Sequence, residues 1–293
     1  GMVCKETMTC PDHGYLFPEE ALKDDKGSLV CTKCNKDVEV GRVIKMSKSK
    51  KNVVDPSELL EKYGADVTRL FCLFAAPPER DLEWSEDGVE GSNRFVNRVW
   101  RLALECLEKI DGFKPFTGAA LDLSSEQAKA LYIKANQTIQ KVTDDIDKSF
   151  HFNTAISAVM ELVNALYAID LDSADEEMKK VILFSLENIL LLLSPILPHF
   201  CEELFAKMGK TGSIIEQHWP EYRKDSLTTD ELIVVVQVNG KLRSKFIIDA
   251  GVGEAVIKET ALADEKIKKY IGDKKPKKVI IIRKKQTLIN IVV

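Results

Sequence analysis

The chain has 293 residues, of which 45% are hydrophobic and 30% are charged, and its formal net charge is −4. This composition is that of an ordinary soluble protein with room for two or three domains. The most apolar stretch, residues 181–205, is interrupted by charged residues and prolines, and residues 1–10 lack a long apolar core. We therefore expect neither a membrane span nor a signal peptide, and a cytoplasmic location.

Residues 1–40 are rich in turns and contain two pairs of potential metal ligands. Cys10 and His13 form one pair and Cys31 and Cys34 the other, each with two intervening residues, and 17 residues separate the pairs. Each pair can place both ligands on one tight turn, and two such turns complete a tetrahedral zinc site. The spacing predicts bound zinc, with Cys4 as an alternative to His13 for the fourth ligand.

A basic loop follows at residues 41–56. Its centre is the pentapeptide Lys45, Met46, Ser47, Lys48 and Ser49, and two further lysines follow at positions 50 and 51. Asp55 is placed as a helix N-cap and Pro56 suits the first helical position. Lysines beside a helix N-terminus are suited to binding a polyphosphate, because cations and backbone N–H groups both stabilise it. The alternative is a solvated surface charge run.

From Pro56 to about residue 208 the apolar residues recur at helical spacing. The pattern predicts helices over 56–76 with a break at Gly64, and over 92–110, 124–147, 153–167, 176–193 and 198–208. Long helices with short connections predict a helical bundle. Three cysteines fall in these apolar patterns and are expected to be buried free thiols, namely Cys72, Cys106 and Cys201.

From Glu231 the period changes to two, which predicts strands on both sides of a hairpin turn at Asn239-Gly240. A predicted helix over 254–270 and predicted strands over 278–283 and 287–293 complete a small ββαββ domain. Residues 231–293 contain 14 Lys/Arg and 7 Asp/Glu, an excess of +7, which leaves −11 on the rest of the chain. A basic domain in an otherwise acidic chain indicates a polyanionic partner.

The loop and its surroundings resemble the KMSKS signature of class I aminoacyl-tRNA synthetases. The pentapeptide is followed by Lys-Asn-Val-Val-Asp-Pro at 51–56, by Tyr-Gly-Ala-Asp at 63–66 and by Arg-Leu-Phe at 69–71. The stretch 82–95, which begins Leu-Glu-Trp, narrows the resemblance to the leucyl family of the bacterial type. Residues 152–156 and 194–205 resemble the anticodon-binding helical domain, and the ββαββ tail resembles the C-terminal domain of that family.

This resemblance implies a mainly α protein corresponding to the C-terminal portion of a leucyl-tRNA synthetase. The implied domains are the leucine-specific insertion at 1–40, the KMSKS loop and stem-contact helices at 41–90, an anticodon-binding-like bundle at 91–225 and a tRNA-binding α/β domain at 231–293. The family activates leucine with ATP and magnesium and transfers it to leucine tRNA. By resemblance the pentapeptide binds the ATP phosphates, Lys48 stabilises them in the transition state and Lys45 provides a second contact.

No nucleotide-binding βαβ pattern and no HIGH motif occur in the chain, so the isolated chain is expected to be catalytically inactive. We also expect it to be a monomer. Contacts with tRNA phosphates are expected from two basic surfaces. They comprise Lys241, Arg243 and Lys245, expected to alternate along one strand face, Arg283 and Lys284 near the opposing turn, and Arg94 and Arg98 on the second helix. For Arg94 and Arg98 a solvated face is an equal alternative. Three other identities stay open: a free-standing zinc-containing RNA-binding module, a structural helical scaffold, and part of a valyl, isoleucyl or methionyl synthetase.

Overall fold

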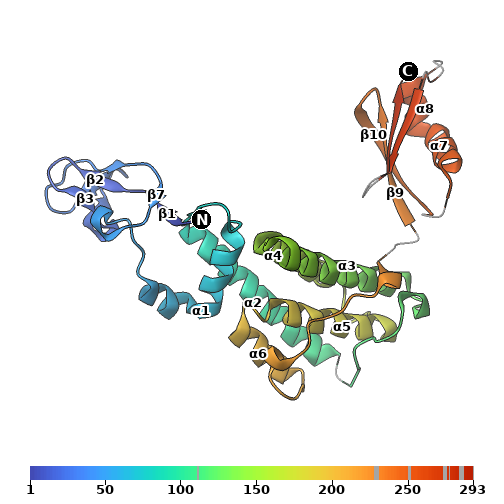
Figure 1. Ribbon diagram of the computed structural model, residues 1–293, viewed down its shortest axis with the longest axis horizontal. Helices are drawn as coiled ribbons and strands as arrows, with labels where there is room; N and C mark the ends of the chain where they lie inside the picture. Colours follow the sequence, from blue (N-terminus) through green and yellow to red (C-terminus); the bar gives the residue numbers. More distant parts are fainter. Residues whose placement is uncertain are drawn as a thin grey trace. The chain divides into compact units, whose positions relative to one another are not determined.

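A computed structural model describes residues 1–110, 112–227, 231–249, 252–272, 276, 278–283 and 287–292. The chain divides into two compact units, Gly1–Arg223 and Lys224–Val293, and each has a hydrophobic core of its own (Figure 1). Within the described residues no helix combines the length and apolarity that crossing a membrane requires.

The first unit begins with short strands and a small core. The strands are β1 (Val3–Lys5), β2 (Met8–Cys10), β3 (Gly14–Leu16), β4 (Ala21–Lys23), β5 (Leu29–Cys31), β6 (Glu39–Val40), β7 (Ile44–Lys45) and β8 (Leu82–Glu83). They form three sheets in the orders β3-β2-β6, β4-β5 and β7-β1-β8. Leu16 and Val38 pack with two of the paired cysteines, Cys10 and Cys31. An apolar core this small contributes little stability by itself.

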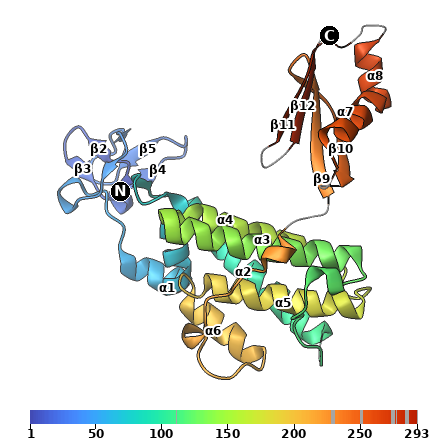
Figure 2. The same cartoon turned by 45° about the vertical axis from the view of Figure 1, so that its right-hand side comes forward.

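Six helices make up the rest of the first unit, and Figure 2 shows α3, α4 and α5 running side by side. They are α1 (Pro56–Ala75), α2 (Glu86–Lys109), α3 (Glu126–Ser149), α4 (Phe152–Tyr167), α5 (Glu176–Leu193) and α6 (Pro198–Lys207). Shorter 3₁₀ turns occur in this unit at Pro18–Glu20, Lys48–Lys50, Ala120–Asp122 and Ile214–Glu216, and a further one, Lys224–Ser226, begins the second unit. The predicted helical bundle is confirmed.

Local capping explains where several helices begin. The Asp55 carboxylate accepts a hydrogen bond from Ser57 N at 2.8 Å, which confirms the predicted N-cap, and Gly64 at φ 80° confirms the predicted break. The prediction that the second helix begins at residue 92 was wrong. The helix begins at Glu86 because the Ser85 hydroxyl accepts a hydrogen bond from Gly88 N.

One of the three expected buried thiols is exposed. Cys106 and Cys201 are buried as predicted, whereas Cys72 lies on the outer face of α1, next to the buried Phe71. Neighbouring residues on a helix point about 100° apart, so an apolar neighbour does not ensure burial.

Truncating a bundle core leucine tests how much of the stability of the chain depends on this packing. Leu186 on α5 is fully buried, and we expect Leu186→Ala to lower the free energy of unfolding by about 2–5 kcal/mol, from lost transfer energy and the remaining cavity. Leu121 is 74% exposed, and Leu121→Ala is the matched control, with an expected change of no more than about 0.5 kcal/mol. Denaturant unfolding measures both, and equal losses would contradict the assigned core.

The described residues of the second unit form a four-stranded sheet with two short helices. Its elements are β9 (Glu231–Val238), β10 (Lys241–Asp249), α7 (Glu254–Ala263), α8 (Glu265–Ile271), β11 (Lys278–Arg283) and β12 (Thr287–Val292). The strand order is β10-β9-β12-β11, and β12 runs parallel to β9. Its core combines β9 and β12 residues such as Val236 and Ile289 with Ile257 and Ile267 from the helices.

Turn chemistry accounts for the hairpin in this unit and for one departure from the predicted elements. Asn239 and Gly240 have φ values of 49° and 77°, as the predicted type I′ turn requires. The single helix predicted over 254–270 was wrong, because the chain leaves helical geometry at Asp264. The Asp264 carboxylate accepts hydrogen bonds from Lys266 N and Ile267 N, so it caps a second helix instead of continuing the first.

Candidate functional site

The two predicted ligand pairs come together at one point of the first unit. Cys10 ends β2 and Cys31 ends β5, and each is followed by a tight turn that carries the second ligand of its pair, His13 or Cys34. The Cys10 and Cys34 Sγ atoms lie 3.5 Å apart, and His13 Nδ1 lies 3.6 Å from the Sγ atoms of both Cys10 and Cys31. All four ligand atoms lie within 4.8 Å of one another, and Cys4 is not in this group.

Both ligand turns have a residue with left-handed backbone conformation directly after the second ligand. Gly14 follows His13 at φ 67°, and Asn35 follows Cys34 at φ 55°. A residue in the left-handed region reverses the chain directly after the second ligand, and Gly and Asn adopt that conformation most readily. The left-handed residue therefore lets both ligands of a pair face the same point.

The donor set fits zinc. Sulfur and nitrogen ligands at about 2.0–2.3 Å from a tetrahedral ion lie roughly 3.5–3.8 Å from one another. The Cys10–Cys34, Cys10–His13 and Cys31–His13 separations of 3.5–3.6 Å fall in this range. Burial raises the pKa of the Cys10 thiol, but hydrogen bonds from the backbone of Asp12 and from His13 outweigh it and lower the pKa to about 6. A thiol that ionises readily suits metal binding, because the thiolate is the ligand.

The basic loop is anchored by a strand on one side and by a buried amide on the other. β7 pairs antiparallel with β1, so that Lys45 lies opposite Cys4, and Met46 N donates to Val3 O at 3.0 Å. Asn52 is only 3% exposed. Its amide donates to the carbonyls of Lys5 and Ile44 at 3.0 and 3.2 Å, and its Oδ1 accepts from Ser47 N at 2.9 Å. The amide thus connects both ends of the loop to β1.

The lysines of the loop are not equivalent. Lys45 and Lys48 are exposed, Lys50 is half-buried, and none of the three forms an ion pair with any residue that the structure describes. Lys51 instead donates to Glu20 Oε2 at 2.9 Å, and its ammonium lies 5.0 Å from the centre of the Phe17 ring. The Ser47 and Ser49 hydroxyls lie 3.2 Å apart on the same turn, and Met46 is half-buried. Two exposed cations are therefore available for a phosphate ligand.

On α2, Arg94 and Arg98 line a groove of about 620 Å³ together with residues of α1 and α4. Arg94 forms an exposed ion pair with Glu90 at 4.0 Å. The Arg98 guanidinium lies 4.3 Å from the centre of the Tyr167 ring, and the Tyr167 hydroxyl donates to Arg98 O at 2.7 Å. These contacts hold both arginines at the surface without burying them.

In the second unit the expected alternation along β10 is interrupted. Lys241 and Lys245 are exposed, but a register shift between Leu242 and Ser244 places a bulge at Arg243. The Arg243 guanidinium lies 4.0 Å from the centre of the Tyr270 ring on α8. The prediction of one regular face was therefore wrong at Arg243. Arg283 ends β11, and Lys284 falls outside the described residues.

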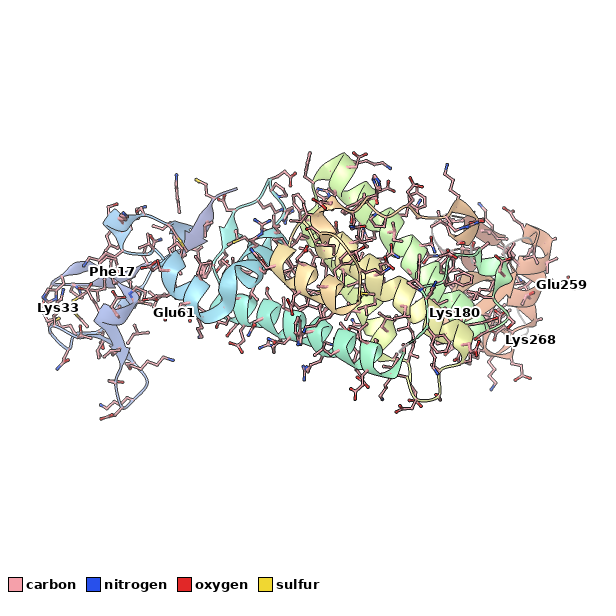
Figure 3. The ribbon with its side chains drawn as sticks, turned by 90° about the horizontal axis from the view of Figure 1, so that it is seen from below. Phe17, Lys33, Glu61, Lys180, Glu259 and Lys268 are labelled. Carbon is pink, nitrogen blue, oxygen red and sulfur yellow. The ribbon has the colours of Figure 1, made fainter. Side chains whose placement is uncertain are left out.

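Sequence reasoning missed a further group of exposed lysines on α8, beside the Arg243–Tyr270 contact. They are Lys266, Lys268 and Lys269, and Figure 3 labels Lys268 on this helix. The signal was the basic run 266–269 directly before an aromatic residue, a composition that suits nucleic acid.

Comparisons with known proteins show which families this chain resembles. Residues 128–258 match the family described as the anticodon-binding domain of tRNA ligase, and residues 36–85 match class I tRNA synthetases of the I, L, M and V group. The chain is 63% identical over 294 residues to a leucine–tRNA ligase of Desulforapulum autotrophicum, and 56% identical over 293 residues to one of Desulfatibacillum aliphaticivorans. Each match covers 100% of this chain and 34% of the relative, so the chain spans about a third of their length.

A solved structure is similar as well. It is described as the ternary complex of Agrobacterium radiobacter K84 agnB2 LeuRS, tRNA and LeuAMS, and it is 29% identical to this chain with a TM-score of 0.72. The match covers 85% of this chain and 30% of that one.

Proposed function

Because the chain belongs to the leucine–tRNA ligases of class I, we propose that it supplies the ATP-phosphate loop and the tRNA-binding surfaces of such an enzyme. One observation supports the first role above all. Lys45 and Lys48 are exposed and unpaired among the described residues, on a loop that β1 and Asn52 fix in place. Leucine–tRNA ligases match the whole chain, which disfavours a free-standing RNA-binding module and a valyl, isoleucyl or methionyl enzyme.

The chemistry follows from where negative charge develops. When a leucine carboxylate attacks the α-phosphate of ATP, charge accumulates on the phosphate oxygens and on the departing pyrophosphate. Lys48 begins the 3₁₀ turn and Lys45 ends β7, so the loop presents two ammonium groups to these oxygens. Ser47 and Ser49 supply hydroxyl donors on the same turn, and ATP enters with magnesium, which shares the neutralisation of charge.

The Cys10, His13, Cys31 and Cys34 group is proposed to bind one structural zinc ion. Three thiolates and an imidazole would provide all four ligands that a structural zinc ion takes. The bound ion would stabilise the small module that precedes the loop.

The second unit is proposed to bind the phosphate backbone of leucine tRNA through exposed lysines of β10, with Arg94 and Arg98 of the bundle as a separate surface. Lys241 and Lys245 are the strongest candidates, because neither forms an ion pair with a described residue. Contacts of this kind give affinity and salt dependence without reading sequence.

The double substitution Lys241→Gln with Lys245→Gln tests this surface. We expect weaker binding of leucine tRNA and a log–log salt slope reduced by roughly one unit per lost contact, because each lysine displaces a phosphate counterion. Lys258→Gln, an exposed lysine on α7 of the same unit, is the matched control and should leave the slope unchanged. Filter binding at several salt concentrations measures it. An unchanged slope in the double variant would assign tRNA binding elsewhere.

A further inference from the structure

We propose that Glu20 couples the metal site to the phosphate loop, by joining the second ligand turn to Lys51. The inference rests on the proposed metal and phosphate sites and adds a positioning residue that belongs to neither. Glu20 lies outside the proposed ligand group of Cys10, His13, Cys31 and Cys34.

The first half of the connection runs from the Cys31–Cys34 turn to Glu20. Thr32 N donates to the Glu20 carbonyl at 3.0 Å, and the Thr32 hydroxyl donates to the same oxygen at 3.2 Å. Lys33 Nζ donates to Glu20 Oε1 at 2.6 Å. Two consecutive residues enclosed between the metal ligands therefore hold Glu20 by its backbone and by its side chain. Three hydrogen bonds thus connect this turn to Glu20.

The second half runs from Glu20 to the loop. Glu20 Oε2 accepts hydrogen bonds from Lys51 Nζ and from Phe17 N, both at 2.9 Å, and the Phe17 ring lies beside the Lys51 ammonium. In Figure 3 Phe17 and Lys33 are both labelled on the small N-terminal module. The Glu20 and Lys51 side chains are 18% and 30% exposed, so water screens this pair less than an open surface pair.

The charge state of Glu20 is consistent with this role. The hydrogen bond from Lys33, then that from Phe17 N, then that from Lys51 hold the pKa of the Glu20 carboxyl at about 2. The carboxylate is therefore ionised at neutral pH and can bind both cations at once.

Lys51 is the loop residue that Glu20 holds, and its backbone explains why this contact matters for the loop. It follows the 3₁₀ turn Lys48–Lys50, its N–H donates to Lys48 O at 3.2 Å, and it has a left-handed backbone with φ 53°. A non-glycine residue is strained there and requires surrounding contacts to stay in place. By holding Lys51, Glu20 fixes the end of the turn that presents Lys48, and it withdraws one lysine from phosphate binding.

Hydrogen exchange of the amides of residues 47–52 tests the coupling in the full chain, with zinc and after chelation, and zinc content is measured separately. In the wild type we expect chelation to accelerate this exchange at least about tenfold, as expected when a charged hydrogen bond is lost. Glu20→Gln should retain zinc, show fast exchange from the start and respond little to chelation. Asp12→Asn is the control variant, because it breaks the Asp12–Lys36 ion pair of the same module. Its residues 47–52 should exchange at wild-type rates, both with zinc and after chelation.

Two variants of Lys51 separate charge from backbone. Lys51→Arg keeps the cation and should retain the coupling. Lys51→Gly relieves the left-handed backbone but removes the cation, and should lose the coupling. Wild-type protection in zinc-loaded Glu20→Gln, or retained coupling in Lys51→Gly, overturns the proposal. If the wild-type chain binds no zinc, both the metal site and its coupling to the loop are overturned. The difference in loop hydrogen exchange between Glu20→Gln and wild type would still test whether the Glu20–Lys51 contact holds the loop.

Discussion

Replacing Cys31 with serine is expected to abolish stoichiometric zinc binding, with a loss of affinity greater than about 100-fold, the upper range for mutations that only support a ligand. Cys31 is fully buried, and it is both a proposed ligand and a member of the small core formed with Leu16 and Val38. Removing it therefore takes away a proposed ligand and part of the apolar core of this module. Structural zinc is worth about 10–16 kcal/mol in isolated zinc-finger peptides, so residues 1–40 should unfold locally.

Zinc content by elemental analysis and protease sensitivity of residues 1–40 measure this outcome. Cys72→Ser is the matched control, because Cys72 is exposed on α1 and outside the ligand group, and one zinc should remain. Cys4→Ser should likewise retain zinc, whereas His13→Ala should lose it, since the structure groups His13 with the three cysteines. Equal zinc content in Cys31→Ser and Cys72→Ser would contradict the proposed site.

The features that could be predicted from the sequence are those set by neighbouring residues. Asp55 and Pro56 mark a helix start because capping involves a few consecutive backbone groups. Asn239-Gly240 marks a hairpin because positive φ is a property of those two residues. The spacing of each ligand pair was sufficient to predict two turns that each bring two potential ligands together, although the pairing of the two turns depends on the folded module.

The features that could not be predicted depend on contacts between distant parts of the chain. Glu20 and Lys51 are 31 positions apart, and nothing near either residue distinguishes Lys51 from the other lysines of the loop. Asn52 becomes the buried anchor of the loop only because β1 and β7 pair beside it. The bulge at Arg243 is a property of the β9–β10 register, so strict alternation misplaced that side chain.

In a full-length leucine–tRNA ligase that contains this segment, Lys48→Ala is expected to lower leucine-dependent ATP–pyrophosphate exchange by about 10²–10³-fold. This magnitude is typical of removing one preorganised group that stabilises the negative charge developing in the transition state. Because Lys48 is exposed and forms no ion pair with a described residue, its loss should leave folding unchanged and reduce the rate of the chemical step more than leucine binding.

Lys50→Ala is the matched control for Lys48→Ala. Lys50 is a half-buried lysine of the same 3₁₀ turn, and it is not one of the two proposed phosphate contacts, Lys45 and Lys48. Its replacement should lower the exchange rate by less than about tenfold. The isolated 293-residue chain should show no exchange, since a loop that holds phosphates cannot position leucine against ATP by itself. A wild-type rate in Lys48→Ala would remove that lysine from the chemistry. Exchange by the isolated chain would instead require a complete adenylate site within these residues. The assay of the full-length variant therefore tests the role of Lys48, and the assay of the isolated chain tests whether the loop needs the rest of the enzyme.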